Sequence, residues 1–294
     1  MPVPSVPDPE PDPGLALVMG VLNVTPDSFS DGGRFLDPEA AIAHGRALAA
    51  EGAHVIDVGG ESTRPGADPV PVDEEIRRVV PVIEALAADG SVRLSIDTTK
   101  AEVARAAVAA GATLINDVGA GLDAVAADLD VGWIAMHRKG TPRTMQDAPA
   151  YDDVVTEVVE FLDARAAAGR ARGVQEVWVD PGFGFGKTPA HNLALLHHLD
   201  RLVDRGWPVL VGTSRKMTLG RILAASDARG RVEPDPPAER LPELDLEGVD
   251  APTDSADRIE ASVATATWAF LQGVRMVRAH DVLATVQAAK VVAG

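Results

Sequence analysis

Polar side chains in this chain gather directly after short apolar runs, and their types suit an anion bound beside a heterocycle. Arg278 and His280 follow one such run two residues apart, so in an extended strand both face the same side. Lys216 and Arg64 follow two other runs, and together these groups can hold phosphate or pyrophosphate. A surface ion pair is the alternative for each arginine taken alone. The four residues therefore predict a site for a small, highly charged anion.

Short acceptor side chains end other apolar runs. Asp97, Asn116 and Asp180 stand on stiff strand candidates, and their polar atoms can pair with the N–H and C=O groups of a flat heterocycle. Asn23 ends the first run, and its neutral oxygen suits one ligand of a Mg2+ ion whose other ligands are water and phosphate. An Asx turn before Thr25 is the alternative for Asn23. Each residue alone suits a turn or a cap, but the repeated placement favours one shared site.

Three familiar sequence motifs are approached but not met. Residues 181–188 spell P-G-F-G-F-G-K-T, whereas a phosphate loop of the form G-x-x-x-x-G-K-[ST] needs glycine where Pro181 stands. The glycines of this segment also miss the G-x-G-x-x-G spacing of dinucleotide folds. Ser214 lacks the second glycine of a nucleophile elbow. A nucleotide-binding fold and a serine nucleophile are therefore not expected.

The elements that carry these side chains alternate between short β-branched runs and Ala-rich helical stretches. The expected strands are Leu17–Leu22, Val55–Val58, Leu94–Ile96, Leu114–Asn116, Trp133–Met136, Val177–Val179, Val209–Val211 and Met276–Val277. The expected helices are 38–50, 73–88, 99–110, 122–129, 152–171, 189–205, 216–224, 256–272 and 281–292. Short apolar strands joined by helices favour an α/β fold, a (β/α)8 TIM barrel with its chemistry at the carboxyl ends of the strands. A doubly wound open sheet is the alternative.

Composition separates two segments from this single barrel domain, which is expected to span residues 15–294. Residues 1–14 hold six of the 22 prolines and are expected to form a disordered tail. Residues 226–254 are also acidic and rich in proline, and they are expected to form a solvated loop inserted between helices. Much of the acidity therefore lies in these two appendages.

Charge and hydropathy narrow the class of partner. The formal net charge is −17, from 44 acidic and 27 basic residues, which argues against a nucleic-acid partner. No apolar stretch reaches the roughly 18 residues that a membrane span needs, and the first residues lack a signal-peptide pattern. The absence of cysteine excludes disulfides and zinc thiolates. We therefore expect a cytoplasmic protein with no membrane partner.

The motifs in which these residues lie resemble the dihydropteroate synthase family along nearly the whole chain. In order, they are M-G-V-L-N-V-T-P-D-S-F-S-D-G-G (19–33), D-V-G-G-E-S-T-R-P-G (57–66), S-I-D-T (95–98), I-N-D-V (115–118), M-H-x-x-G-T-P-R-T-M-Q (136–146), V-D-P-G-F-G-F-G-K-T (179–188), G-T-S-R-K (212–216) and R-A-H-D-V (278–282). The first two are long enough to indicate the family by themselves.

The resemblance implies a transferase that joins 6-hydroxymethyl-7,8-dihydropterin pyrophosphate to para-aminobenzoate and releases pyrophosphate. The family is usually dimeric and is a sulfonamide target, so a homodimer is expected. Loss of pyrophosphate can leave a delocalised pterin cation, so the substitution can be dissociative. An aromatic amine is largely neutral at pH 7 and needs no strong general base, which fits the absence of a nucleophile–base dyad in the motifs.

The resemblance also implies a role for each motif residue. The pterin is expected to contact Asp97, Asn116, Asp180 and Lys216. The pyrophosphate is expected to contact Arg278, His280 and, through Mg2+, Asn23. The aminobenzoate pocket is expected to include Thr63, Arg64, Pro65 and Phe185, and Met136 and Gly212 complete the substrate-binding set. The residues expected to be catalytic are Lys216, Arg278, His280, Asp97 and Asp180.

The chain departs from the family pattern at few places. Met217 stands where the family often has a serine that can contact the aminobenzoate carboxylate, so altered aminobenzoate contacts are expected. Arg138 and Lys139 replace residues that are often less charged. Two alternatives stay open, namely a folate-dependent methyltransferase domain on the same barrel and a non-catalytic pterin-binding homologue. The first would not need Arg278, His280 or Lys216, and the second should have lost some of the residues named above.

Overall fold

The computed structural model describes residues 16–25, 37–62, 67–141, 143–229 and 252–294. The expected tail, residues 1–14, lies outside these ranges, and so does most of the expected loop at 226–254. No helix within the described ranges is long and apolar enough to cross a membrane.

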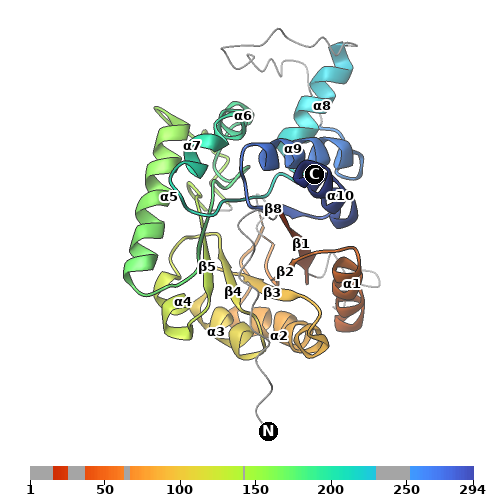
Figure 1. The fold of residues 1–294 in the computed structure, drawn as a ribbon, viewed down its shortest axis with the longest axis vertical. Helices are drawn as coiled ribbons and strands as arrows, with labels where there is room; N and C mark the ends of the chain where they lie inside the picture. The colour runs from red at the N-terminus through yellow and green to blue at the C-terminus, as the bar shows by residue number, and fades with distance from the viewer. Residues whose placement is uncertain (1–15, 26–36, 63–66, 142, 230–251) are drawn as a thin grey trace.

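Eight parallel strands form one sheet in the order β6-β5-β4-β3-β2-β1-β8-β7. Their bounds are β1 Leu17–Asn23, β2 Val55–Gly59, β3 Arg93–Asp97, β4 Leu114–Asp117, β5 Gly132–Met136, β6 Val177–Asp180, β7 Leu210–Val211 and β8 Met276–Ala279. A parallel bridge between Val179 of β6 and Val209 beside β7 joins the two edges of the sheet. The predicted (β/α)8 barrel is therefore confirmed, with helices surrounding the sheet (Figure 1).

The helices follow the predicted order closely. They are α1 Pro38–Ala50, α2 Val72–Asp89, α3 Ala101–Ala109, α4 Asp123–Leu129, α5 Val154–Ala171, α6 Pro189–His197, α7 Leu199–Val203, α8 Met217–Arg229, α9 Ile259–Leu271 and α10 Val282–Ala293, with a 3-10 turn η1 at Ala256–Arg258. The helix predicted over 189–205 is two helices, because His198 leaves the helical conformation at φ −108° and ψ 34°.

Helix α8 extends further along the chain than predicted. Helix α8 continues to Arg229, so residues 226–229 are helical and not part of a loop. Nothing in this stretch stops a helix, since the first glycine after Gly220 is Gly230 and the first proline is Pro234. Residues 230–251 lie outside the described ranges, so the rest of the predicted loop stays a prediction.

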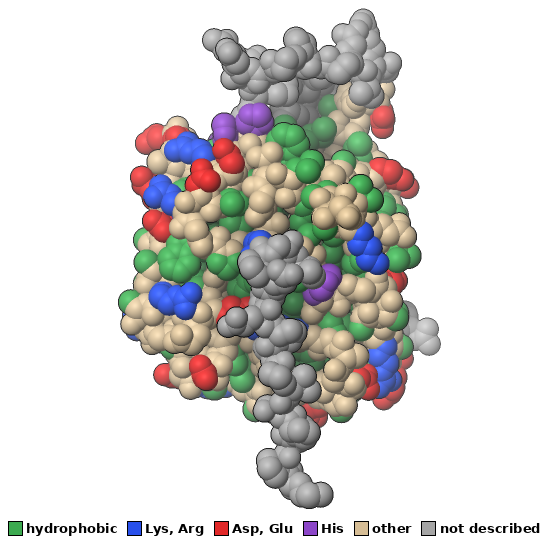
Figure 2. Space-filling view, viewed as in Figure 1, with side chains coloured by type: hydrophobic (Ala, Val, Ile, Leu, Met, Phe, Trp, Pro, Cys, Tyr) green, Lys and Arg blue, Asp and Glu red, His purple; other side chains and the backbone are tan. Residues whose placement is uncertain are grey.

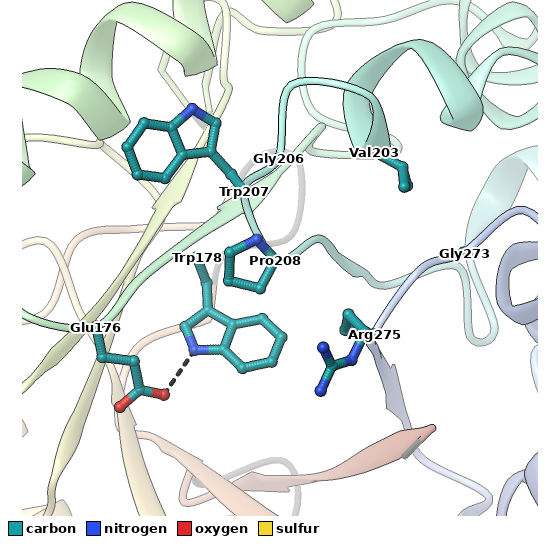
Figure 3. Close-up of a pocket in the computed structure, with 8 residues that line it drawn as sticks. All are labelled: Glu176, Trp178, Val203, Gly206, Trp207, Pro208, Gly273 and Arg275. Carbon is teal, nitrogen blue, oxygen red and sulfur yellow. Dashed lines mark hydrogen bonds between the residues drawn. The ribbon is translucent and has the colours of Figure 1, made fainter. Parts of the chain in front are cut away.

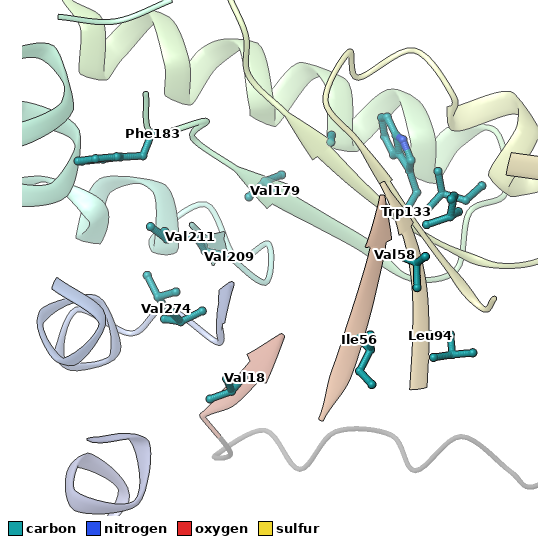
Figure 4. Packing of buried hydrophobic residues seen from close by; sticks show 14 of the residues in the cluster. Val18, Ile56, Val58, Leu94, Trp133, Val179, Phe183, Val209, Val211 and Val274 are labelled. Atoms are coloured by element: carbon teal, nitrogen blue, oxygen red, sulfur yellow. The ribbon is translucent and has the colours of Figure 1, made fainter. Parts of the chain in front are cut away.

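Alternating side chains along each strand divide the core into two layers. Side chains inside the barrel form one cluster, namely Leu17, Met19, Val55, Leu114, Ile134, Trp178, Leu210 and Met276. Their neighbours on the outer faces of the strands, such as Val18, Ile56 and Trp133, belong to a larger cluster with the surrounding helices (Figure 4). The period of two along a strand therefore fixes which positions point into the barrel.

A cavity of about 390 Å³ opens at the amino-terminal end of β6, β7 and β8 (Figure 3). It is lined by Glu176, Trp178, Val203, Gly206, Trp207, Pro208, Gly273 and Arg275. The Trp178 indole N–H donates to Glu176 Oε1 at 2.6 Å, and Arg93 donates to both carboxylate oxygens of Glu176. This end of a TIM barrel serves stability, so we do not place the chemistry here.

We predict that Gly169→Ala destabilises the fold through α5. A Cβ at Gly169 would lie 2.7 Å from Cζ3 of Trp133, which is fully buried and cannot move aside. This overpacking should cost about 1–3 kcal/mol, more than the helix propensity gained by alanine. Urea unfolding measures the loss. Gly121→Ala, where a Cβ meets nothing within 4 Å, is the control and should change stability by less than about 0.5 kcal/mol. Equal stabilities for the two variants would contradict the packing argument.

Candidate active site

The inner face of the barrel changes from apolar to polar within two residues on several strands. The inward positions that follow the apolar cluster are Asp57 after Val55, Asn116 after Leu114, Met136 after Ile134, Asp180 after Trp178, Gly212 after Leu210 and Arg278 after Met276. The strand register places Asn23, Gly59, Asp97 and Asn116 side by side across β1 to β4. The residues predicted from separate motifs therefore meet at one end of the barrel.

Arg278 connects this polar layer. Its Nε donates to Asp57 Oδ2 at 2.6 Å, and its Nη2 donates to Asp97 Oδ2 at 3.0 Å. Asn116 Nδ2 donates to the same Asp57 oxygen at 2.8 Å. The guanidinium thus links β8 to β2 and β3, and the hydrogen bond from Asn116 to Asp57 links β4 to β2.

Asp57 opens the motif at 57–66, but it was given no role at the site from the sequence. It is fully buried, yet it lies inside the predicted strand Val55–Val58 and not after it. A usable signal existed, because Asp57 stands two residues after the inward-facing Val55, as Asn116 stands after Leu114. A charged residue at an inward strand position needs a partner, and here the partner is Arg278.

Three buried oxygens of this layer have no hydrogen-bond donor among the described residues. They are Asp57 Oδ1, Asp97 Oδ1 and Asn116 Oδ1. Buried polar atoms in native proteins are nearly always paired, so such a cluster calls for an explanation. A ligand that presents several N–H groups would supply the missing donors.

Burial moves the pKa values of the two predicted acids toward neutrality. Burial raises the pKa of Asp97 to about 7, an effect that Arg278 opposes and Asp57 reinforces. Burial also raises the pKa of Asp180 to about 6, against the hydrogen bond from the Gly182 N–H and the charge of Lys216. Both carboxyl groups can therefore take up or release a proton near neutral pH.

Lys216 meets Phe185 at the edge of this layer. The Lys216 Nζ lies 4.1 Å from the centroid of the Phe185 ring, and the ring packs in a small cluster with Met136 and Met145. Burial and then the charge of Arg278 lower the pKa of Lys216 to about 8, whereas Asp180 and Asp97 oppose the shift. A cation against an aromatic face can receive a second flat ring or a carboxylate beside it.

His280 is held by Ser214. The backbone N–H of His280 donates to Ser214 Oγ at 3.1 Å, and the hydroxyl lies 3.1 Å from Nδ1 of the ring. The hydroxyl is thus placed to donate to Nδ1, which leaves Nε2 to carry the ring proton. Burial, reinforced by Arg278, lowers the pKa of His280 to about 3. His280 was expected to act with the cations, but here it is a neutral N–H donor at pH 7.

The remaining predicted residues divide into those the structure places and those it does not. Gly212 approaches Arg278 closely, since a Cβ at Gly212 would lie 3.6 Å from the Arg278 Cβ. Asn23 Oδ1 would lie 3.8 Å from a Cβ at Gly59, the residue between Asn23 and Asp97 in the register. Thr63, Arg64 and Pro65 lie outside the described residues.

Comparison with known proteins gives a consistent result. Residues 19–280 match the family described as pterin binding enzymes. The dihydropteroate synthase of Mycobacterium leprae is 45% identical over 283 residues, covering 94% of this chain and 92% of that protein. The dihydropteroate synthase of Escherichia coli is 41% identical over 281 residues, with 94% and 90% covered.

Solved structures agree with these relatives. The Xanthomonas albilineans dihydropteroate synthase with 4-aminobenzoic acid has a TM-score of 0.78 and 47% identity, covering 94% of this chain and 92% of that one. The same enzyme in complex with 7,8-dihydropteroate has a TM-score of 0.76 and 44% identity, with 95% and 93% covered. The Yersinia pestis enzyme in a sulfonamide drug complex has a TM-score of 0.81 and 41% identity, with 96% and 94% covered.

The fold, the polar layer and these matches define a class: the chain belongs to the family of pterin binding enzymes. Within that family it is a dihydropteroate synthase, a transferase of the folate pathway. The expectation drawn from the eight motifs is confirmed.

We predict that Asp180→Asn stabilises the ligand-free protein more at pH 7 than at pH 4. Native Asp180 keeps its proton up to about pH 6, whereas the unfolded carboxyl loses it near its ordinary pKa of 3.8, so rising pH favours the unfolded wild type across this window. The asparagine has no proton to lose. Its advantage over wild type should grow by on the order of 2–3 kcal/mol between pH 4 and pH 7.

Urea unfolding at several pH values measures this difference, with the exposed Asp128→Asn as the control. A stability difference that stays constant from pH 4 to pH 7 would show that Asp180 ionises at its ordinary pKa in the native protein.

Proposed function

We propose that the mouth of the barrel catalyses the dihydropteroate synthase reaction with the residues of the polar layer. The three buried oxygens without donors, on Asp57, Asp97 and Asn116, are the observation that carries this assignment. A dihydropterin presents ring and exocyclic N–H groups along one edge, so it supplies the missing donors. Asp180 faces the same space from β6 and adds a fourth acceptor.

The pyrophosphate site is proposed at Arg278 and His280. Departure of pyrophosphate from the pterin methylene leaves a cation that the electron-rich ring delocalises, so the enzyme mainly stabilises the leaving charge. Arg278 is partly exposed and keeps N–H groups beyond its bonds to Asp57 and Asp97, and the neutral His280 can donate through Nε2. Both groups lie on β8 or directly after it, so they act together.

Magnesium is proposed to arrive with the pyrophosphate. No group of three or more acidic, histidine or cysteine side chains that could hold a metal exists among the described residues, so a fully protein-bound ion does not fit. Mg2+ keeps most of its waters and needs only one or two protein oxygens, and Asn23 Oδ1 at the end of β1 fits that role. The ion would offset negative charge on the leaving pyrophosphate.

The aminobenzoate pocket is proposed beside Phe185 and Lys216. The Lys216 ammonium already lies over the face of the Phe185 ring, and a solved relative is in complex with 4-aminobenzoic acid. Met217, half-exposed at the start of α8, has no hydroxyl for the carboxylate, so the backbone N–H groups of that helix start would receive it instead. Thr63, Arg64 and Pro65 stay predictions for this pocket. Sulfonamides, one of which is bound to a relative, are proposed to compete for it.

A homodimer is also proposed. Helices α9 and α10 pack together (Figure 1). Apolar side chains lie exposed on both helices, namely Trp268 and Leu271 on α9 and Leu283 on α10. A second copy could cover this surface. Acidic and basic side chains lie interspersed among the described residues of the face in Figure 2. The cytoplasmic location expected from the sequence stays a prediction.

Pyrophosphate release that requires both the dihydropterin pyrophosphate and para-aminobenzoate tests the proposed function. We predict that Arg278→Ala lowers kcat by about 30-fold to 1000-fold, since one contact to a departing anion is typically worth about 2–4 kcal/mol of barrier. Arg278→Lys keeps the charge but not the two-point geometry, and it should fall between wild type and the alanine variant.

The alanine variant also leaves Asp57 and Asp97 without their cation, so its stability falls as well. Turnover must therefore be measured well below its melting temperature. Wild-type kcat in folded Arg278→Ala would remove Arg278 from the proposed mechanism.

A further inference from the structure

The loop between β6 and α6 is close in sequence to a phosphate loop, but the opposite backbone groups point toward its centre. A phosphate loop turns backbone N–H groups inward around an anion. Here the loop turns carbonyl oxygens inward around a cation of the chain itself, Lys187, which is 2% exposed. Its Nζ donates to Phe185 O at 3.0 Å, to Gly182 O at 3.1 Å and to His137 O at 3.3 Å, and it lies 2.9 Å from His137 Nδ1.

The loop can close around Lys187 only because glycines occupy its turns. Gly182 and Gly186 both adopt φ of 66°, in the left-handed region. A Cβ at Gly182 would lie 1.9 Å from His137 O, and one at Gly186 would lie 2.2 Å from Lys139 O. The loop therefore lies directly against the backbone that leaves β5, and the ammonium bonds both segments at once.

The two loop carbonyls that Lys187 holds belong to residues that set the active site. Gly182 donates its N–H to Asp180 Oδ1 at 2.7 Å, and Phe185 carries the ring under Lys216. A shift of this loop would thus move the Asp180 carboxylate and the Phe185 ring together. Lys187 Nζ bonds the backbone of the loop and not the ring or the carboxylate, so it positions both through the backbone, and its charge also acts on the Asp180 carboxyl from a distance.

We propose that Lys187 is a positioning residue of the reaction, an internal cation that holds the β6–α6 loop in the conformation that aligns Asp180 and Phe185 for the two substrates. This inference rests on the proposed roles of Asp180, Phe185 and Lys216. Burial lowers the pKa of Lys187 to about 7, with Lys216 adding to the shift and Asp180 opposing it. Burial also lowers the pKa of His137 to about 3, which leaves its ring a neutral acceptor.

The test is steady-state kinetics of Lys187→Met at pH 6, where the wild-type ammonium is charged. The methionine fills the same space without N–H groups. The KM values for both substrates should rise about tenfold to a hundredfold, because small misplacements of binding groups have effects of this size. Arg93→Met is the matched control. It removes a partly buried cation bonded to Glu176 at the opposite end of the barrel, so it should lower stability and leave both KM values unchanged.

Two measurements distinguish a failure of the proposed function from a failure of the role proposed for Lys187. Wild type without two-substrate pyrophosphate release would defeat the proposed function, whereas active wild type with unchanged KM values in Lys187→Met would overturn the role of Lys187. If Lys187→Met does not fold, hydrogen exchange of the ligand-free wild type tests the inference instead. The amides of Gly182, Gly184 and Phe185, all hydrogen-bonded within the protein, should exchange slowly if the loop is held before substrate binds. Fast exchange at these amides would overturn the inference.

Discussion

In a closed barrel every second side chain of a strand points inward, and the inner space narrows to what side chains alone can fill. In this chain the apolar cluster inside the barrel and the polar layer therefore lie one above the other, two residues apart along a strand. Met276 belongs to the apolar cluster, Arg278 lies in the polar layer, and His280 follows directly after the strand. The site therefore depends on register: a strand shifted by one residue would turn its charged side chain toward the helices.

The polar layer is held together by charges that have little water around them. Asp57 and Asp97 share one guanidinium, and each keeps an oxygen without a donor. Such an arrangement costs stability in the ligand-free protein, as the raised pKa of Asp97 and of Asp180 shows. Active sites commonly hold strain of this kind, because groups placed for a ligand cannot also satisfy one another.

The strands, the barrel and most of the site residues could be predicted because short β-branched runs with polar ends are local signals. The structure lengthens most strands to include those ends, such as Asn23, Asp97 and Asp180. Asp57 was named only as part of a motif and given no role, although its inward position, two residues after Val55, indicates one. The role of Lys187 could not be found locally, since its Nζ contacts His137, fifty residues away in sequence. The break at His198 is equally invisible in a continuous helical pattern.

The balance of charge in the mouth matters for the proposed binding of pyrophosphate by an acidic protein. With every group ionised, Arg278 and Lys216 face three carboxylates, Asp57, Asp97 and Asp180, which would repel pyrophosphate. Burial raises the pKa of Asp97 and of Asp180 to near neutrality, so these carboxyl groups can hold protons and the layer loses negative charge. An approaching anion would raise both pKa values further and draw in protons as it binds. Arg278 then acts on the proposed leaving pyrophosphate, whereas Asp97 and Asp180 keep acceptor capacity for the heterocycle in either protonation state.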